Sequence, residues 1–293
     1  ICQGFAKTGM YSVIIGAVLN IVLDPVFIFG FHMGVSGAAT ATVLSQTASC
    51  AFVLKTLFGK TVPVRITFGG YDWRLIRRIL TIGFTPFIII AMDNVMIITM
   101  NAILQKYGGA ARGDLLITCA TIAQSFMLVV TMPLGGITSG TQAVLAYNFG
   151  AGNTDRVKGA QKYIFILAAA YTTLLFILAR TVGGLFVRLF TSDPTVAAEA
   201  LRAIRIFTLA IIPLAFQYEI VDGFTGLGQV QVALPLSFFR KGLYFVSLFL
   251  LPAMFGAEAA FFAEPVSDIA GPVVSAIVYI VSMKGILAKA GKN

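Results

Sequence analysis

A single carboxylate lies inside an apolar stretch near the start of the chain. Asp24 is the only charged residue between positions 10 and 29, a run close to the roughly 20 residues that a helix needs to cross a bilayer. Asn20 precedes it by one helical turn and shares its face. A charge at membrane depth costs about 2.5–3.5 kcal/mol and marks an ion or substrate path by default. Asn20 adds a second oxygen, and Pro25 opens backbone carbonyls there. The alternative is a carboxylate that reaches the headgroups from the helix end.

A second polar group falls in a later apolar stretch. Asp93 is followed by Asn94, and Asn101 lies seven residues further on, on roughly the same helical face as Asn94. These residues could form a cation or substrate site. They could equally form a structural polar cluster that is hydrogen-bonded between helices.

A third group contains two carboxylates on one helix. Glu219 and Asp222 are three residues apart, with Gln217 nearby. Carboxylates that close repel each other, so we expect one of them to be protonated or bound to a cation. The alternative is that both lie near water at the helix end, which the glycines after position 222 indicate.

The elements that position these residues are transmembrane helices. The chain is 58% hydrophobic and 11% charged, whereas soluble domains carry about 25% charged residues. No segment has the alternating pattern of a transmembrane β-strand. The sequence therefore predicts an all-α polytopic membrane protein. We expect eight spans: 9–30, 35–58, 83–105, 114–148, 160–190, 197–226, 232–255 and 265–288. The fourth is too long for one straight helix, and Pro133 predicts a kink in it.

The basic residues are distributed as membrane topology requires, so the net charge of +9 does not indicate a nucleic-acid partner. With the N-terminus in the cytoplasm, the inner loops hold most of the lysines and arginines. This excess predicts that both ends of the chain are cytoplasmic, in a plasma (inner) membrane. Arg240 and Lys241 fall inside the seventh span. Either they extend to the membrane surface, or they pair with Glu219 or Asp222.

The longest polar stretch separates two spans from six. Within it, Asp72 is a plausible N-cap of a short amphipathic helix over residues 72–80. We therefore divide the chain into 1–58, the last two helices of one lobe; 59–82, a cytoplasmic linker that contains the amphipathic helix; and 83–293, a six-helix lobe.

Several motifs in order resemble the multidrug and toxic compound extrusion (MATE) transporters. They are LNIVLDPVFIFG at 19–30, GVSGAATATVLSQ at 34–46, MPLGGITSGTQAVLAYNFGAG at 132–152 and EPVSD at 264–268. The resemblance implies a bundle of twelve helices in two six-helix lobes, of which this chain holds the fifth to the twelfth. The chain also starts with Ile rather than Met. We therefore expect an N-terminal truncation, and we expect the isolated chain to be inactive.

The resemblance also implies a function and a site. Members of the family export cationic or amphipathic small molecules in exchange for Na⁺ or H⁺, and need no other cofactor. Their cation-coupling residues correspond to Asn20, Asp24 and Thr42 here, with Asp24 as the Na⁺ ligand if Na⁺ is the coupling ion. The family's Asp on the first helix has no counterpart. Some members use acids in the second lobe, which would be Asp93 or the Glu219 group. We expect the full-length protein to function as a monomer.

Two other function classes fit less well. A lipid-linked oligosaccharide flippase of the same superfamily would need a polar, often basic cavity, whereas the central spans hold few arginines or lysines. A membrane enzyme would need a catalytic group, but the sequence has one His, no close pair among its three Cys, and no nucleophile with a neighbouring base. We therefore predict a transporter and not an enzyme.

Overall fold

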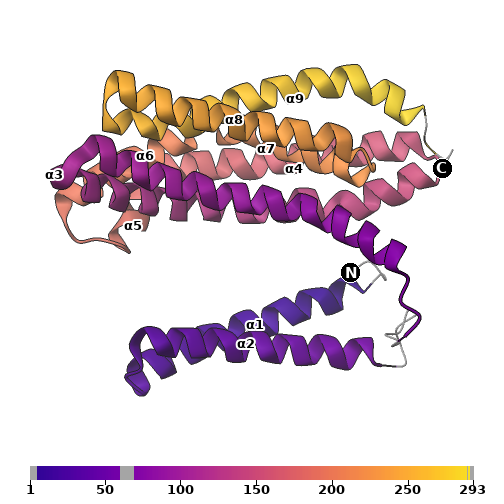
Figure 1. The fold of residues 1–293 in the computed structure, drawn as a ribbon, viewed down its shortest axis with the longest axis horizontal. Coiled ribbons are helices and arrows are strands. Elements are labelled where there is room, and N and C mark those ends of the chain that lie inside the picture. The colour runs from indigo at the N-terminus through magenta and orange to yellow at the C-terminus, as the bar shows by residue number, and fades with distance from the viewer. Residues whose placement is uncertain (1–4, 60–68, 289, 291–293) are drawn as a thin grey trace. The chain divides into compact units, whose positions relative to one another are not determined.

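The computed structural model describes residues 5–59, 69–288 and 290. The chain divides into two compact units, Ile1–Ile76 and Arg77–Asn293, which are described separately. All regular structure among the described residues is helical (Figure 1). This confirms the predicted all-α class.

The first unit is a helical hairpin. Helix α1 spans Ala6–Pro25 and continues into a single π-helical segment, η1, over Val26–Gly30. Helix α2 follows over Gly34–Leu57 after a short turn. The turn requires left-handed backbone at two positions, His32 (φ 53°) and Gly34 (φ 56°). His32 is therefore a turn residue.

Small residues form the contact between α1 and α2. The buried residues of α2 are Gly37, Ala41 and Ser45, spaced by four so that they line one face. A Cβ on Gly37 would lie 2.9 Å from the backbone of Phe27. Small residues at this spacing let two membrane helices approach closely. One helical turn after Ser45, the Ser49 hydroxyl donates to the Ser12 carbonyl at 2.7 Å. We call this contact between α1 and α2 the seam.

The next helical segment, α3, spans Trp73–Gly150 and consists of two helices joined at Gly109. Asp72 caps its start, because the Asp72 carboxylate accepts a hydrogen bond from the Arg74 N–H at 2.8 Å. The predicted cap is confirmed. The predicted short helix over 72–80 is not a separate element, however, since the helix runs on into the next span. Residues 60–68 of the predicted linker lie outside the described residues.

Gly109 makes the tight turn between the two helices of α3. Its φ of 63° and ψ of −172° suit only glycine, and Gly108 and Gly113 approach so closely that a Cβ on Gly108 would lie 2.8 Å from Gly113. Gly109 has the only non-helical dihedrals among the described residues of α3. The backbone is therefore helical through Pro133, and the kink expected there stays a prediction.

The second unit continues with long helices that run alongside one another (Figure 1). Its remaining elements are α4 (Thr154–Thr181), α5 (Gly183–Arg188), α6 (Pro194–Phe207), the 3₁₀ turn η2 (Thr208–Ala210), α7 (Ile211–Gly226), α8 (Val230–Phe255), the 3₁₀ helix η3 (Ala257–Phe262) and α9 (Ala263–Leu287). Helix α7 contacts α4, α8 and α9. It also holds Glu219 and Asp222, so these carboxylates lie on a helix with neighbours on several sides.

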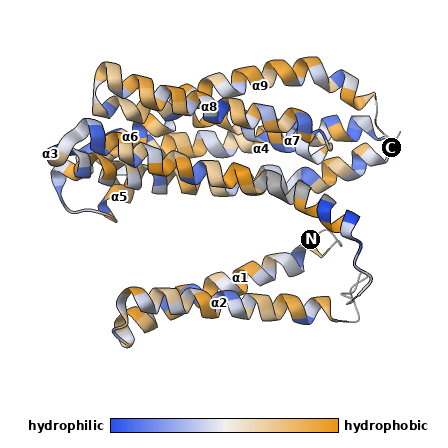
Figure 2. Cartoon of the chain, viewed as in Figure 1, coloured by the Kyte–Doolittle hydropathy of each residue, from blue (hydrophilic) through white to orange (hydrophobic). Residues whose placement is uncertain are grey.

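Eight helical segments are long and apolar enough to cross a membrane, which is the predicted number for the described part of the chain. Figure 2 shows that hydrophobic residues dominate their length. The predicted boundaries differ most from the structure in the fifth span. The fifth span was expected over 160–190, but α4 starts at Thr154 and ends at Thr181, and α5 is a separate short helix. The break falls at Val182, whose φ of −116° and ψ of 4° are not helical and which precedes two glycines.

Charged side chains form a network at one end of the second unit. Glu258 of η3 accepts from Arg112 and, at 2.8 Å, from Arg202 of α6. Glu199 lies 3.7 Å from Arg112 and 3.8 Å from Arg202. These pairs connect the start of the second helix of α3 with α6 and η3.

Candidate functional site

The structure brings together the three residues predicted as the cation-coupling set. The Asn20 amide of α1 donates to Asp24 Oδ1 at 3.3 Å and to Thr42 Oγ1 of α2 at 3.4 Å. Asn20 and Asp24 are partly buried, while Thr42 is more exposed. Both bonds are at the long end of the normal range and therefore weak. One amide thus links a carboxylate and a hydroxyl across the hairpin.

This group lies within the apolar part of the hairpin. Asp24 lies about 9 Å from the end of the span Lys7–Gly30 at 1.5 Å per residue. Pro25 has no N–H, so it removes the donor that would bond the Ile21 carbonyl in a regular helix. The π-helical segment starts directly after Pro25. Such segments occur often at functional sites.

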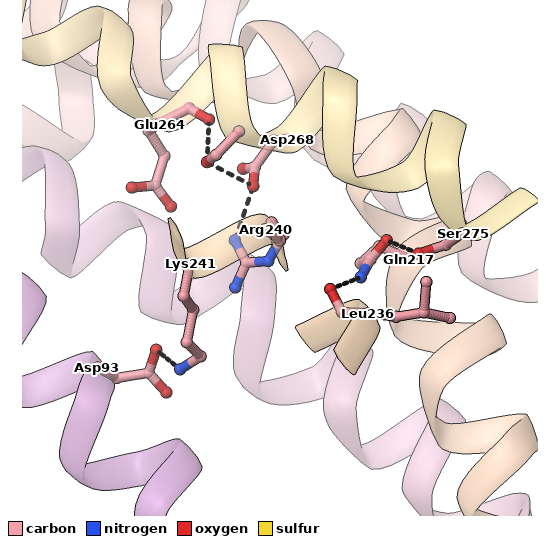
Figure 3. A network of polar contacts seen from close by, with 9 residues as sticks. Asp93, Gln217, Leu236, Arg240, Lys241, Glu264, Asp268 and Ser275 are labelled. Atoms are coloured by element: carbon pink, nitrogen blue, oxygen red, sulfur yellow. Dashed lines mark hydrogen bonds and ion pairs between the residues drawn. The ribbon is translucent and has the colours of Figure 1, made fainter. Parts of the chain in front are cut away.

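A second polar group in the other unit centres on two consecutive basic residues of α8 (Figure 3). Lys241 forms an ion pair with Asp93 of α3, and Arg240 forms one with Asp268 of α9 at 2.8 Å. Consecutive helical residues point about 100° apart, which lets one dipeptide bind two different helices.

Neither expectation for the basic dipeptide is met. Arg240 and Lys241 lie about 15 Å or more from both ends of α8, and their side chains are 13% and 3% exposed. They do not extend to the membrane surface. Their partners are also not Glu219 or Asp222, since the helix directs them towards α9 and α3.

Gln217 and Asp222 of α7 are fixed by other helices. The Gln217 amide donates to the Leu236 carbonyl at 3.4 Å and accepts from the Ser275 hydroxyl at 2.6 Å (Figure 3). Asp222 accepts from the Thr138 hydroxyl at 2.5 Å. These bonds connect α7 with α8, α9 and α3, so three neighbouring helices hold the polar side chains of α7 in place.

Glu219 is set apart from this group. Its side chain is 1% exposed, and neither carboxylate oxygen has a hydrogen-bond partner among the described residues. A Cβ on Gly223 would lie 3.7 Å from Glu219 Oε1 and 3.1 Å from Gln161 Nε2. The neighbourhood thus includes one amide group of α4, but no bond forms. A buried ionised carboxylate without a partner is very costly.

Two cavities adjoin the basic dipeptide. The smaller has a volume of about 170 Å³ and the larger about 360 Å³. Three residues line both: Asp93, Tyr218 and Arg240. Gln217, Asp222 and Lys241 line the smaller cavity. Met96, Met127 and Glu264 line the larger.

The remaining predicted residues lie elsewhere. Glu219, Asn94 and Asn101 do not line either of these cavities. Asn94 donates to the Ile90 carbonyl of its own helix at 3.0 Å, and Asn101 Oδ1 is buried without a partner among the described residues.

Two acids of α9 were missed as site residues. Glu264 and Asp268 belong to a motif that supported the family resemblance, but they were not assigned to a site. Asp268 is fully buried and Glu264 lines the larger cavity. Their spacing of four residues on an apolar helix was a signal that could have identified them.

Sequence comparison decides the family. The model of the MatE family matches residues 90–250, more than half of the chain. The chain belongs to the MatE family. This confirms the resemblance to MATE transporters and makes the chain a multi-pass membrane protein.

Individual relatives agree with the family. The multidrug export protein MepA of Staphylococcus aureus is 25% identical over 257 residues, which cover 86% of this chain and 55% of MepA. A crystal structure of MATE in complex with MaL6 superposes with a TM-score of 0.86 at 21% identity, over 97% of this chain and 64% of that one. A MOP superfamily transporter from Pyrococcus furiosus gives the same values. The structural likeness confirms the MATE-type fold. The chain spans about half the length of MepA.

Proposed function

We propose that this MatE protein exports cationic or amphipathic small molecules in exchange for Na⁺ or H⁺, and that Asn20, Asp24 and Thr42 form the coupling site. The observation that carries the proposal is the Asn20 amide, which links Asp24 to Thr42 within an apolar hairpin. The names of the relatives support multidrug export over the flippase alternative. They also support a transport role rather than an enzymatic one.

The coupling step follows from the chemistry of these side chains. Carboxylate, hydroxyl and amide oxygens are hard ligands that suit Na⁺. A half-turn of the Asn20 amide would replace Nδ2 by Oδ1, so that all three side chains present oxygen. A proton on Asp24 is the other way to neutralise the site. Either Na⁺ binding or protonation neutralises Asp24 in a low-dielectric surrounding and shifts α1 between two packing states. Coupling requires at least such a two-state element.

Transport in membrane vesicles tests the proposal. Inverted vesicles from cells that express the full-length protein would be given a Na⁺ or H⁺ gradient, and the movement of a fluorescent cationic dye would be followed. We expect gradient-driven movement that is lost in Asp24→Asn. Movement that survives this substitution would overturn Asp24 as the coupling residue. No movement under either gradient, with transport of lipid-linked oligosaccharide instead, would overturn the exporter assignment.

The proposed orientation, with both ends cytoplasmic, is tested separately. A membrane-impermeant maleimide should label Glu258→Cys in right-side-out vesicles and Lys284→Cys in inverted ones, in a background without native cysteines. The reverse pattern would invert the topology.

A further inference from the structure

The Lys241 ammonium lies between two oxygen groups of one helical turn. It donates to the Ile89 carbonyl of α3 at 2.8 Å and pairs with the Asp93 carboxylate. Ile89 and Asp93 are four residues apart, so both oxygens lie on the same face of α3. A backbone carbonyl and a carboxylate are also the groups that bind a hard monovalent cation in membrane helices. The ammonium therefore occupies a position, between the Ile89 carbonyl and the Asp93 carboxylate, that such a cation could also occupy.

The two partners differ in their access to open space. The Asp93 side chain is 50% exposed, whereas that of Lys241 is 3% exposed. Asp93 also lines both cavities. A mobile cation in either cavity could thus reach the carboxylate, while the lysine stem stays buried. Figure 3 shows Lys241 extending towards Asp93.

The surrounding charges are mostly acidic. Asp222 lines the smaller cavity and Glu264 the larger. The other basic residue, Arg240, is already paired with Asp268. Without the lysine charge, the cavity walls would carry a marked excess of carboxylates. In a low-dielectric surrounding such an excess attracts a cation strongly.

We propose that Lys241 is a resident counter-ion, which occupies the place where a free monovalent cation would otherwise bind between Asp93 and the Ile89 carbonyl. The second unit therefore holds this site without an inorganic ion. A cation could occupy the position between Asp93 and the Ile89 carbonyl only by displacing the ammonium. The proposal concerns residues of Arg77–Asn293 alone and goes beyond the proposed function, because it does not require that Asp24 couples transport.

Sodium binding tests the proposal. The purified chain in lipid nanodiscs would carry Asp24→Asn, which removes the carboxylate of the proposed coupling site. Radioactive Na⁺ binding would be measured at constant ionic strength with choline as the replacement cation. We expect no specific binding in this parent and saturable binding after Lys241→Met, which keeps an apolar stem and removes the charge. Adding Asp93→Asn should abolish the new binding.

Two controls separate charge from packing. Lys241→Arg keeps the charge and should bind no Na⁺, while Lys241→Gln is the alternative if the Met variant does not fold, as judged by a monodisperse elution profile. A folded Met or Gln variant that binds no Na⁺ would overturn the proposal. Na⁺ binding by the Asp24→Asn parent that is lost on adding Asp93→Asn would also overturn the proposal, because the ion would then bind while Lys241 is still present.

Discussion

Gly271 of α9 makes room for the side chain of Arg240. A Cβ at position 271 would lie 2.8 Å from Arg240 Cγ and 3.0 Å from its Cβ. The arginine stem passes over this glycine and reaches Asp268 on the preceding turn of the same helix, at 2.8 Å. The ion pair between α8 and α9 thus depends on the absence of a side chain at Gly271.

This relationship predicts the effect of Gly271→Ala. The added methyl group should displace Arg240 and destabilise the protein by about 1–3 kcal/mol, the usual cost of overpacking. Thermal unfolding in detergent would show a lower Tm. Gly285→Ala is the matched control, because it lies on the same helix with nothing within 4 Å of its Cβ. Equal Tm values for the two variants would show that Gly271 does not position Arg240.

The Thr42 hydroxyl provides a test of the proposed coupling site. It donates to the Ala38 carbonyl at 2.9 Å and accepts from Asn20. Thr42→Val should weaken coupling-cation affinity about 3- to 18-fold, since polar contacts between membrane helices are worth about 0.6–1.7 kcal/mol. The cation dependence of dye efflux measures this. Thr47→Val, which removes a hydroxyl bonded to the Val43 carbonyl of its own helix, should leave the dependence unchanged. A matching loss in both variants would argue against a role for Thr42.

The charged network around Glu258 predicts a salt-dependent contribution to stability. Glu258→Gln should lower the Tm at low ionic strength, because two arginines lose their shared partner. The loss should shrink in high salt, which screens half-exposed charges. Asp155→Asn breaks only an exposed pair with Lys158 at 3.8 Å and should have little effect. A Tm loss that is independent of salt would point to packing rather than charge.

Glu219 predicts an unusual gain in stability. Its two carboxylate oxygens are buried without a partner among the described residues, and an unsatisfied buried polar group costs about 1–3 kcal/mol. Glu219→Met should therefore raise the Tm. Asp222→Met should not, because its carboxylate accepts a bond from Thr138 at 2.5 Å. A lower Tm for Glu219→Met would mean that the carboxylate binds a cation or a polar group in the folded protein.

The sequence predicts the helices of this protein well, because hydropathy reflects the solvent in which each residue lies. Eight predicted spans correspond to eight apolar helical segments in the part of the chain that the structure describes. The error at the end of α4 has a local cause. Val182 is apolar and does not interrupt the hydropathy signal, yet its backbone is not helical.

The candidate sites are predictable only where one helix carries them. Asn20 and Asp24 are one turn apart on α1, so their proximity follows from helical spacing, and the family resemblance supplied Thr42. The partners of Arg240 and Lys241 depend instead on how α8 is rotated against its neighbours. That rotation is set by packing, including the space left by Gly271, and no periodicity in the sequence expresses it.

The seam between α1 and α2 bears on how the chain enters the membrane. Gly37, Ala41 and Ser45 allow the two helices to associate directly, and the Asn20 amide can then find Asp24 and Thr42 within the same hairpin. A helix that carries a carboxylate is a poor substrate for insertion by itself. The Thr42 hydroxyl that accepts from Asn20 is encoded just downstream, in α2. This polar contact forms only when both helices are in place, so α1 gains from entering the membrane together with α2.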